Sequence, residues 1–245
     1  MRTVSLGVLL TFLLAGLALA SGGSAKMSPQ EALKEVIQHN DRFVREHKAE
    51  DFSAYQTAQH PILTLVTCSD ARVQTEALLP EAIDRVFAIR NIGNQVGNSQ
   101  GSVDYGILHL HTPILLILGH THCGAVKAAM GDYSGETPGI IAELDHLHLP
   151  LSRGPKEGDF EKRWLQNVEE NVHYQVKQAL RAYKEKVAHG ELVIVGAVYD
   201  FINAYGKGFG RVVIIDVNGE KDSAKIRAHQ VMSLLSENLK AVCTK

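Results

Sequence analysis

The hydrophobic pattern divides the chain into short apolar runs and longer amphipathic segments. The short runs are rich in branched residues and are continuous rather than alternating, which is typical of strands buried on both faces of a parallel sheet. They cover residues 62–67, 85–89, 114–118, 192–198 and 212–217. Helical patterns lie between them. The pattern therefore predicts an α/β fold with a mostly parallel central β-sheet flanked by helices.

The amphipathic segments carry apolar residues at three- and four-residue steps, as helices do. We predict helices over residues 102–111, from residue 125 to 130, from 164 to 188, and from 222 onward. The segment 131–159 is rich in glycine, proline and charge around a short apolar piece, so it is predicted as an irregular surface excursion.

A further helix is predicted near the N-terminus. Ser28-Pro29-Gln30-Glu31 is a capping box with proline at the first helical position. The residues that follow form one apolar stripe up to about His47, including Leu33, Val36, Ile37, Phe43 and Val44. Such a stripe needs a partner surface, either on its own domain or on a neighbouring subunit, and the spacing leaves both open.

The first twenty residues have the pattern of a secretory signal peptide. Arg2 provides a basic start, residues 8–19 are apolar, and Ala20 ends the run among small residues. The run is short for a membrane span, so an uncleaved anchor is the weaker alternative. We expect an exported protein, periplasmic or secreted, with no stable membrane association after cleavage.

This interpretation sets the domain boundaries. Residues 1–20 are the predicted signal peptide, and residues 21–245 form a single domain. Within it we expect a helical arm at 27–49, an α/β core at 60–218 and a C-terminal helix at 222–243.

Composition supports one globular domain and excludes some partners. The 245 residues are 45% hydrophobic, enough for a sizeable core. The 27 acidic and 25 basic side chains nearly balance, so no nucleic-acid partner is indicated. Cys68, Cys123 and Cys243 are odd in number and irregularly spaced, so a disulfide framework is not expected.

The chemistry lies at the ends of two predicted strands. Cys68 ends the first strand, while His120 and Cys123 follow the third. Because the carboxyl ends of parallel strands meet at one edge of a sheet, neighbouring strands would bring the three side chains together. Two thiols and an imidazole suit zinc, and three protein ligands leave a fourth position for water.

Two charged residues follow the first of these candidate ligands. Asp70 must either become a fourth metal ligand or be held away from the metal, and Arg72 is placed to hold it by a two-pronged hydrogen bond. An ordinary ion pair that closes a loop is the structural alternative. His122 is a possible further imidazole or proton relay, but its side chain should point away from the metal.

Two motifs, Cys-x-Asp-x-Arg at 68–72 and Gly-His-Thr-x-Cys-Gly-Ala at 119–125, resemble the zinc site of the β-class carbonic anhydrases. The likeness extends to Gln59-x-Pro61 and to Arg90-Asn91-x-Gly93-Asn94. Two positions depart from the family pattern. Ala71 replaces the usual serine, and Leu65 stands where some members have the tryptophan of an inhibitory bicarbonate site, so that regulation is not expected.

The resemblance implies a set of roles. One zinc ion per chain would be held by Cys68, His120 and Cys123, with Asp70 and Arg72 as a catalytic dyad. Gln59 would contact substrate near a dimer interface. The family's unit is a dimer whose N-terminal helices wrap the partner, so a homodimer or a higher homo-oligomer is expected here.

The expected reaction is the reversible hydration of carbon dioxide to bicarbonate and a proton. Zinc lowers the pKa of a bound water to about 7, so zinc-bound hydroxide is available to attack the substrate. Alternatives are a hydrolase of carbon disulfide or carbonyl sulfide with the same site, and a non-catalytic structural zinc module closed by Asp70. The motif of zinc deaminases is absent. A cysteine and histidine nucleophile pair would leave Cys68 without a purpose.

Overall fold

The computed structural model describes residues 27–245 and separates into an N-terminal unit that ends at Ala54 and a core unit, Tyr55–Lys245. The predicted signal peptide, residues 1–20, lies outside the described residues. Within residues 27–245 the structure contains no helix with the length and apolar character needed to span a membrane.

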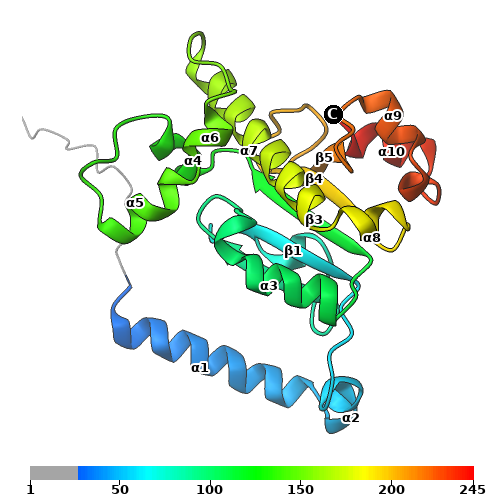
Figure 1. The fold of residues 1–245 in the computed structure, drawn as a ribbon. Coiled ribbons are helices and arrows are strands. Elements are labelled where there is room, and N and C mark those ends of the chain that lie inside the picture. The colour runs from blue at the N-terminus through cyan, green and yellow to red at the C-terminus, as the bar shows by residue number, and fades with distance from the viewer. Residues whose placement is uncertain (1–26) are drawn as a thin grey trace, which may run out of the picture. The chain divides into compact units, whose positions relative to one another are not determined.

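The core unit is built on a five-stranded sheet (Figure 1). The strand order is β2-β1-β3-β4-β5, in which the first four strands are parallel and β5 is antiparallel to β4. The strands are β1 (Leu63–Cys68), β2 (Val86–Asn91), β3 (Ile114–His120), β4 (Val193–Asp200) and β5 (Arg211–Val217). The predicted α/β class and the predicted strands are confirmed, and β1 and β3 are neighbours.

Helices connect and cover these strands. Those in the core unit include α3 (Gln100–Asp104), which continues as a π-helical turn (Tyr105–His109), α4 (Gly124–Ala129), α7 (Phe160–Ala182) and α8 (Lys184–Ala188). Short 3-10 turns occur at Ser53–Tyr55, Thr75–Ala77, Gly97–Ser99 and Gln230–Met232. The long predicted helix over 164–188 is therefore two helices, because Tyr183 leaves helical geometry between them.

Close packing brings α7 onto the strands that carry the site. Val168, Val172 and Val176 of α7 are fully buried. A Cβ atom at Gly119 of β3 would lie 2.7 Å from Val172 Cγ2, and one at Gly196 of β4 would lie 2.8 Å from Val176 Cγ2. Only glycine therefore allows this approach without a shift. The middle of α7 is in this way fixed beside the end of β3.

The segment 131–159 is more regular than its composition predicts. It contains α5 (Pro138–Asp145) and α6 (His148–Leu151). The Thr137 side chain accepts from the Ile140 amide and starts α5, with Pro138 at the first helical position. Leu144, Leu147 and Leu151 are buried in the core. The prediction of an irregular surface excursion is wrong, because these leucines attach the segment to the core.

The C-terminal segment is also different from its prediction. A single helix over 222–243 was expected, but the structure has α9 (Ser223–Ala228), a 3-10 turn and α10 (Glu237–Cys243). His229 is extended and its ring accepts from the Val231 amide, and Ser236 accepts from the Leu239 amide. These side chains cap the 3-10 turn and α10, so α9 ends before them. The prediction of one continuous helix is therefore wrong.

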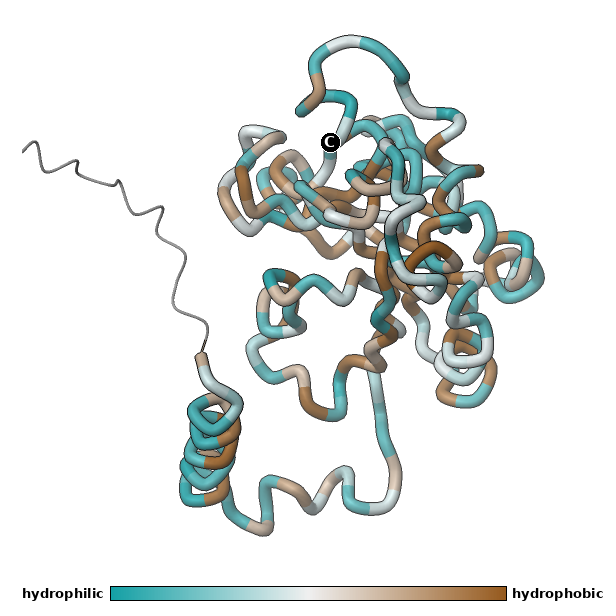
Figure 2. The backbone as a smooth tube through the Cα atoms, turned by 90° about the vertical axis from the view of Figure 1, so that its left-hand side faces the viewer, coloured by the Kyte–Doolittle hydropathy of each residue, from teal (hydrophilic) through white to brown (hydrophobic). Residues whose placement is uncertain are grey.

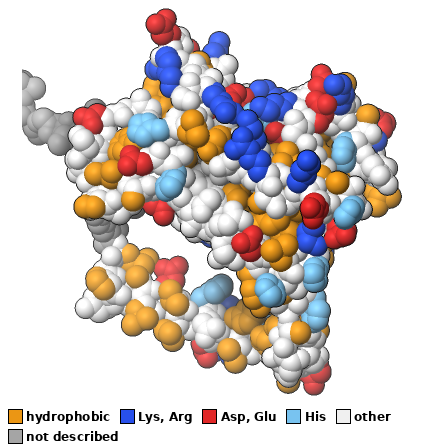
Figure 3. Space-filling view, viewed as in Figure 1, with side chains coloured by type: hydrophobic (Ala, Val, Ile, Leu, Met, Phe, Trp, Pro, Cys, Tyr) orange, Lys and Arg blue, Asp and Glu red, His pale blue; other side chains and the backbone are white. Residues whose placement is uncertain are grey.

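The N-terminal unit contains α1 (Pro29–Glu46) and α2 (Ala49–Phe52). The predicted capping box is confirmed, because Ser28 Oγ accepts from the Glu31 amide at 3.3 Å and the Ser28 amide donates to Glu31 Oε2 at 2.8 Å. Figure 2 shows apolar residues along one side of α1, and Figure 3 shows hydrophobic side chains gathered over it. None of the residues of α1 is buried within the described chain, and Leu33 is 63% exposed.

Candidate metal centre

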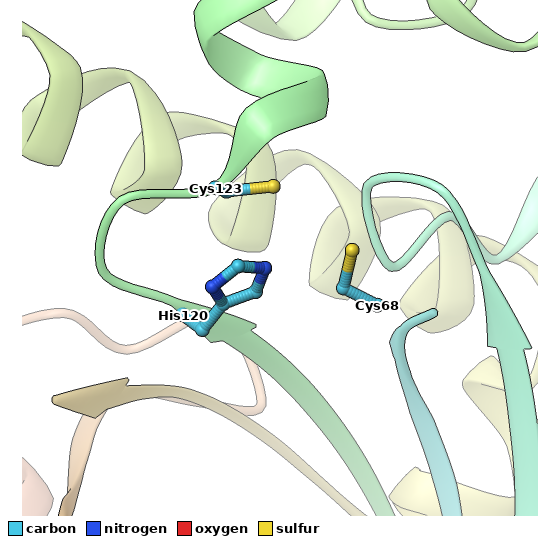
Figure 4. Close-up of side chains that lie close together, drawn as sticks. All are labelled: Cys68, His120 and Cys123. Atoms are coloured by element: carbon cyan, nitrogen blue, oxygen red, sulfur yellow. The ribbon is translucent and has the colours of Figure 1, made fainter. Parts of the chain in front are cut away.

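Three side chains meet at the carboxyl edge of the sheet. Cys68 is the last residue of β1, His120 is the last residue of β3, and Cys123 is the N-cap of α4. Their ligand atoms lie within 4.8 Å of one another, and the side chains point toward a common centre (Figure 4). All three are buried, with 4%, 0% and 1% exposure. The predicted convergence is confirmed, since β1 and β3 are paired.

The His120 ring is oriented as a metal ligand requires. Its Nδ1 atom lies 2.9 Å from the Thr121 carbonyl oxygen, so we assign the ring proton to Nδ1. The Nε2 lone pair then faces the two thiols, and within the described residues this buried atom has no hydrogen-bond partner. A buried nitrogen without a partner is costly unless a ligand occupies its lone pair. The donor set therefore fits a zinc ion.

The two thiols share a proton in the metal-free chain. Cys123 donates a hydrogen bond to Cys68, which lowers the pKa of Cys68 well below the usual thiol range. The same bond, together with burial, raises the pKa of Cys123. The Gly93 amide points at Cys68, and the Ala125 and Val126 amides point at Cys123. These donors favour sulfur anions, so a divalent cation would replace the shared proton.

Asp70 is held by Arg72 through three hydrogen bonds. Asp70 Oδ1 accepts from Arg72 N at 2.9 Å and from Arg72 Nε at 2.8 Å, and Oδ2 accepts from Nη2 at 2.6 Å. The Arg72 guanidinium holds the pKa of Asp70 well below its usual range, and Asp70 raises the pKa of Arg72. Asp70 Oδ2 lies 3.8 Å from His120 Nε2, beside the metal group. A fourth ligand at Asp70 stays a prediction.

Arg90 fixes the backbone between Cys68 and Asp70. Its Nη2 atom donates to the Cys68 carbonyl oxygen at 3.0 Å and to the Asp70 carbonyl oxygen at 2.8 Å. Its Nη1 atom donates to Gln74 Oε1 at 3.0 Å. The sequence pattern included Arg90 in a motif without giving it a role. In the structure it sets the distance between a metal ligand and the dyad.

His122 points away from the metal, as predicted. Its backbone has a φ of 53°, and its Nε2 atom lies 2.8 Å from Glu161 Oε2. Its ring stacks on Trp164 with 4.6 Å between ring centroids, and Trp164 Nε1 donates to the Cys123 carbonyl oxygen at 2.9 Å. The start of α7 thus holds the metal-binding loop, a role that the sequence pattern did not give to Glu161 or Trp164.

Two other residues complete the account of the site. Phe201, which follows β4 directly, lies under the Arg72 guanidinium, and sequence reasoning missed it. The rule that ligands gather beyond the carboxyl ends of parallel strands is the one signal that could have drawn attention to this position. Gln59 is exposed in the segment before β1, outside the metal group. Its predicted contact with substrate stays a prediction.

Known proteins resemble this chain in sequence and in fold. The carbonic anhydrase family model matches residues 63–206. Carbonic anhydrase 2 of Mycobacterium tuberculosis is 28% identical over 204 residues, which cover 77% of this chain and 94% of that protein. The carbonic anhydrase of Mycolicibacterium smegmatis is 30% identical over 187 residues, which cover 70% of this chain and 89% of that protein.

The solved structure of a Coccomyxa β-carbonic anhydrase in complex with acetazolamide has 25% sequence identity to the chain. It superimposes with a TM-score of 0.66 over 80% of this chain and 91% of that one. Fold and site together define a zinc-dependent α/β enzyme. The chain belongs to the β-class carbonic anhydrase family. The predictions of carbonic anhydrase activity and of zinc held by Cys68, His120 and Cys123 are confirmed.

Proposed function

We propose that each chain binds one zinc ion and uses it to hydrate carbon dioxide reversibly, with Asp70 and Arg72 as the dyad that keeps the site open. One observation carries this proposal. The buried lone pair of His120 Nε2 faces two thiols, while the neighbouring Asp70 carboxylate is turned to Arg72 through both of its oxygens. A structural zinc site would instead use such a carboxylate to close its coordination shell.

When bound, zinc lowers the pKa of a coordinated water to about 7 and so supplies a nucleophile near neutral pH. Asp70 would accept a hydrogen bond from a nucleophile held there and would orient it toward the carbon of the substrate. Arg72 prevents Asp70 from turning to the metal, because both carboxylate oxygens are already accepting from it. The lowered pKa of Asp70 keeps it ionised, so the proton released by each turnover leaves through water or buffer.

The active unit in this proposal is a homodimer or a larger homo-oligomer. The exposed stripe on α1 supports it, because Leu33, Val36, Ile37 and Val44 are each more than half exposed in the single chain. The core unit also exposes Tyr105 and Leu108. An exposed apolar stripe like the one on α1 is typical of an interface. Gln59 would contact substrate near that interface, which fits its exposed position before β1.

Export is part of the same proposal and rests on the pattern of residues 1–20. Cleavage after Ala20 would leave a mature chain beginning at Ser21. N-terminal sequencing of protein recovered from the periplasm or the medium tests this, and an intact Met1 on the recovered protein would contradict it.

The catalytic proposal is tested by stopped-flow hydration of carbon dioxide with zinc measured in the same samples. The rate should fall with zinc on treatment with a chelator and return when zinc is added back. It should also rise between about pH 7 and 8.5 at constant zinc. Stoichiometric zinc without hydration would favour the structural module. Faster release of sulfide from carbonyl sulfide or carbon disulfide than hydration of carbon dioxide would favour the alternative hydrolase.

A further inference from the structure

Phe201 contacts both the metal-binding group and the dyad of Asp70 and Arg72. The Arg72 Cζ atom lies 4.5 Å from the centroid of the Phe201 ring, and the His120 and Phe201 rings stack with centroids 5.9 Å apart and an angle of 28°. Phe201 follows β4, the strand paired with β3. One side chain that directly follows a third strand therefore contacts a metal ligand and the arginine of the dyad.

Arg72 needs a support of this kind. Its side chain is 51% exposed, and its polar contacts run from Nε and Nη2 to Asp70 and from Nη2 to the His122 carbonyl oxygen. A guanidinium donates in its own plane, so these bonds fix its direction but leave its two faces open. The Phe201 ring covers one face and attracts the cation through the negative charge density of the ring. The plane of the guanidinium is thereby set.

Phe201 is itself held in place. The preceding residue, Asp200, is fully buried and accepts from the Ala204 and Tyr205 amides at 3.0 and 2.9 Å, which fixes the turn that carries Phe201. The Tyr199 ring lies against it with centroids 6.0 Å apart. The position of the Phe201 ring is thus defined independently of its contact with Arg72.

We propose that Phe201 is a positioning residue for the reaction, which holds the Arg72 guanidinium in the plane that keeps Asp70 paired and away from the metal. The inference rests on the proposed role of the dyad. It adds that the electron density of the ring, rather than its volume, keeps the dyad closed.

Fluorinated phenylalanines at position 201 test this, because they keep the shape of the ring while weakening its attraction for a cation. Hydration should fall stepwise with the number of fluorine atoms, to about one tenth with the pentafluoro ring, at unchanged zinc content. Phe201→Tyr should retain activity and Phe201→Leu should lose as much as the pentafluoro ring. The same fluorinated series at Phe209, which is 77% exposed in the following loop, is the matched control.

A second readout is independent of turnover. The Arg72 Nε proton, which is bonded to Asp70, should exchange with solvent about tenfold faster in Phe201→Leu and in the pentafluoro variant than in the unmodified enzyme, measured by NMR. If hydration fails in the unmodified enzyme, the proposed function fails, while this exchange rate still tests the contact. Equal rates and equal exchange across the fluorinated series would overturn the role of Phe201, whatever happens to the leucine variant.

Discussion

The metal centre and the helix α1 differ in where their contacts come from. Every ligand of the metal centre is buried, and its supports come from β2, β4 and α7 of the same unit: Arg90, Phe201 and Trp164. In α1 the capping box is complete, yet no residue is buried. Local rules thus suffice to form α1, but its apolar stripe stays exposed among the described residues, 27–245. The metal ligands and these supports all come from one unit, whereas the apolar stripe of α1 stays exposed within the described residues.

Removing a metal ligand should have the largest effect on the metal centre. Cys123→Ser should lose zinc and reduce hydration to the uncatalysed rate, because the site depends on two sulfur anions. The loss of zinc affinity should exceed the roughly 10–100-fold typical of outer partners. Zinc analysis beside circular dichroism checks it. Cys243→Ser, outside the metal group, is the control and should keep both zinc and activity. Full activity in Cys123→Ser would rule out the ligand assignment.

A charge on the apolar stripe of α1 should weaken the association of subunits. Leu33→Glu should weaken self-association, because a buried leucine contributes about 1.5–3 kcal/mol and each subunit loses one. The dissociation constant should rise at least about tenfold, measured by sedimentation velocity over a dilution series. Gln38→Glu places the same charge on the opposite side of α1. If both variants associate alike, the stripe is not the interface.

The hydrogen bond from Trp164 to the Cys123 carbonyl oxygen should have a smaller effect. Trp164→Phe removes the indole N–H but keeps an aromatic ring against His122. The free energy of unfolding of the zinc-loaded protein should fall by about 1 kcal/mol. Urea unfolding followed by circular dichroism measures it, because the only tryptophan is lost. Phe160→Leu, in the same turn of α7, has no such bond and serves as the control. An unchanged unfolding midpoint in Trp164→Phe would show that this hydrogen bond does not stabilise the protein.

The shared thiol proton should give the smallest signal. In the metal-free protein, absorbance near 240 nm should show one thiolate persisting well below the usual thiol pKa of about 8.5. It should disappear as the pH falls through the lowered pKa of Cys68. The second thiolate should form only above the usual range, because the pKa of Cys123 is raised. Cys123→Ala removes this donor altogether, so the low step should move upward. Two thiols titrating together near the usual value would contradict the sharing.

The sequence predicted those parts of the site that follow from strand ends. Cys68 and His120 stand at the ends of two apolar runs, so parallel strands were enough to bring them together. Phe201 obeys the same rule, but a lone phenylalanine after a strand carries no chemical signal of its own. Trp164 reaches the site from α7, more than forty residues after Cys123, and only tertiary packing reveals that contact.

The wrong predictions share a physical cause. Over 131–159 glycine and proline suggested a loop, yet Thr137 caps a helix and three leucines attach it to the core. Over 222–243 the apolar spacing suggested one helix, yet His229 and Ser236 cap separate turns. In both segments capping side chains decide where the helices begin, and average composition does not resolve that choice.

The central claim is that Arg72 keeps Asp70 off the metal, and Arg72→Ala tests it most directly. Zinc content and stopped-flow hydration should be measured on the same preparation, with Arg72→Lys as an intermediate that keeps the charge but not the two-pronged fork. We predict about one zinc per chain in Arg72→Ala, with hydration reduced at least about 100-fold because Asp70 is free to close the fourth position. Undiminished hydration at full zinc would contradict the claim.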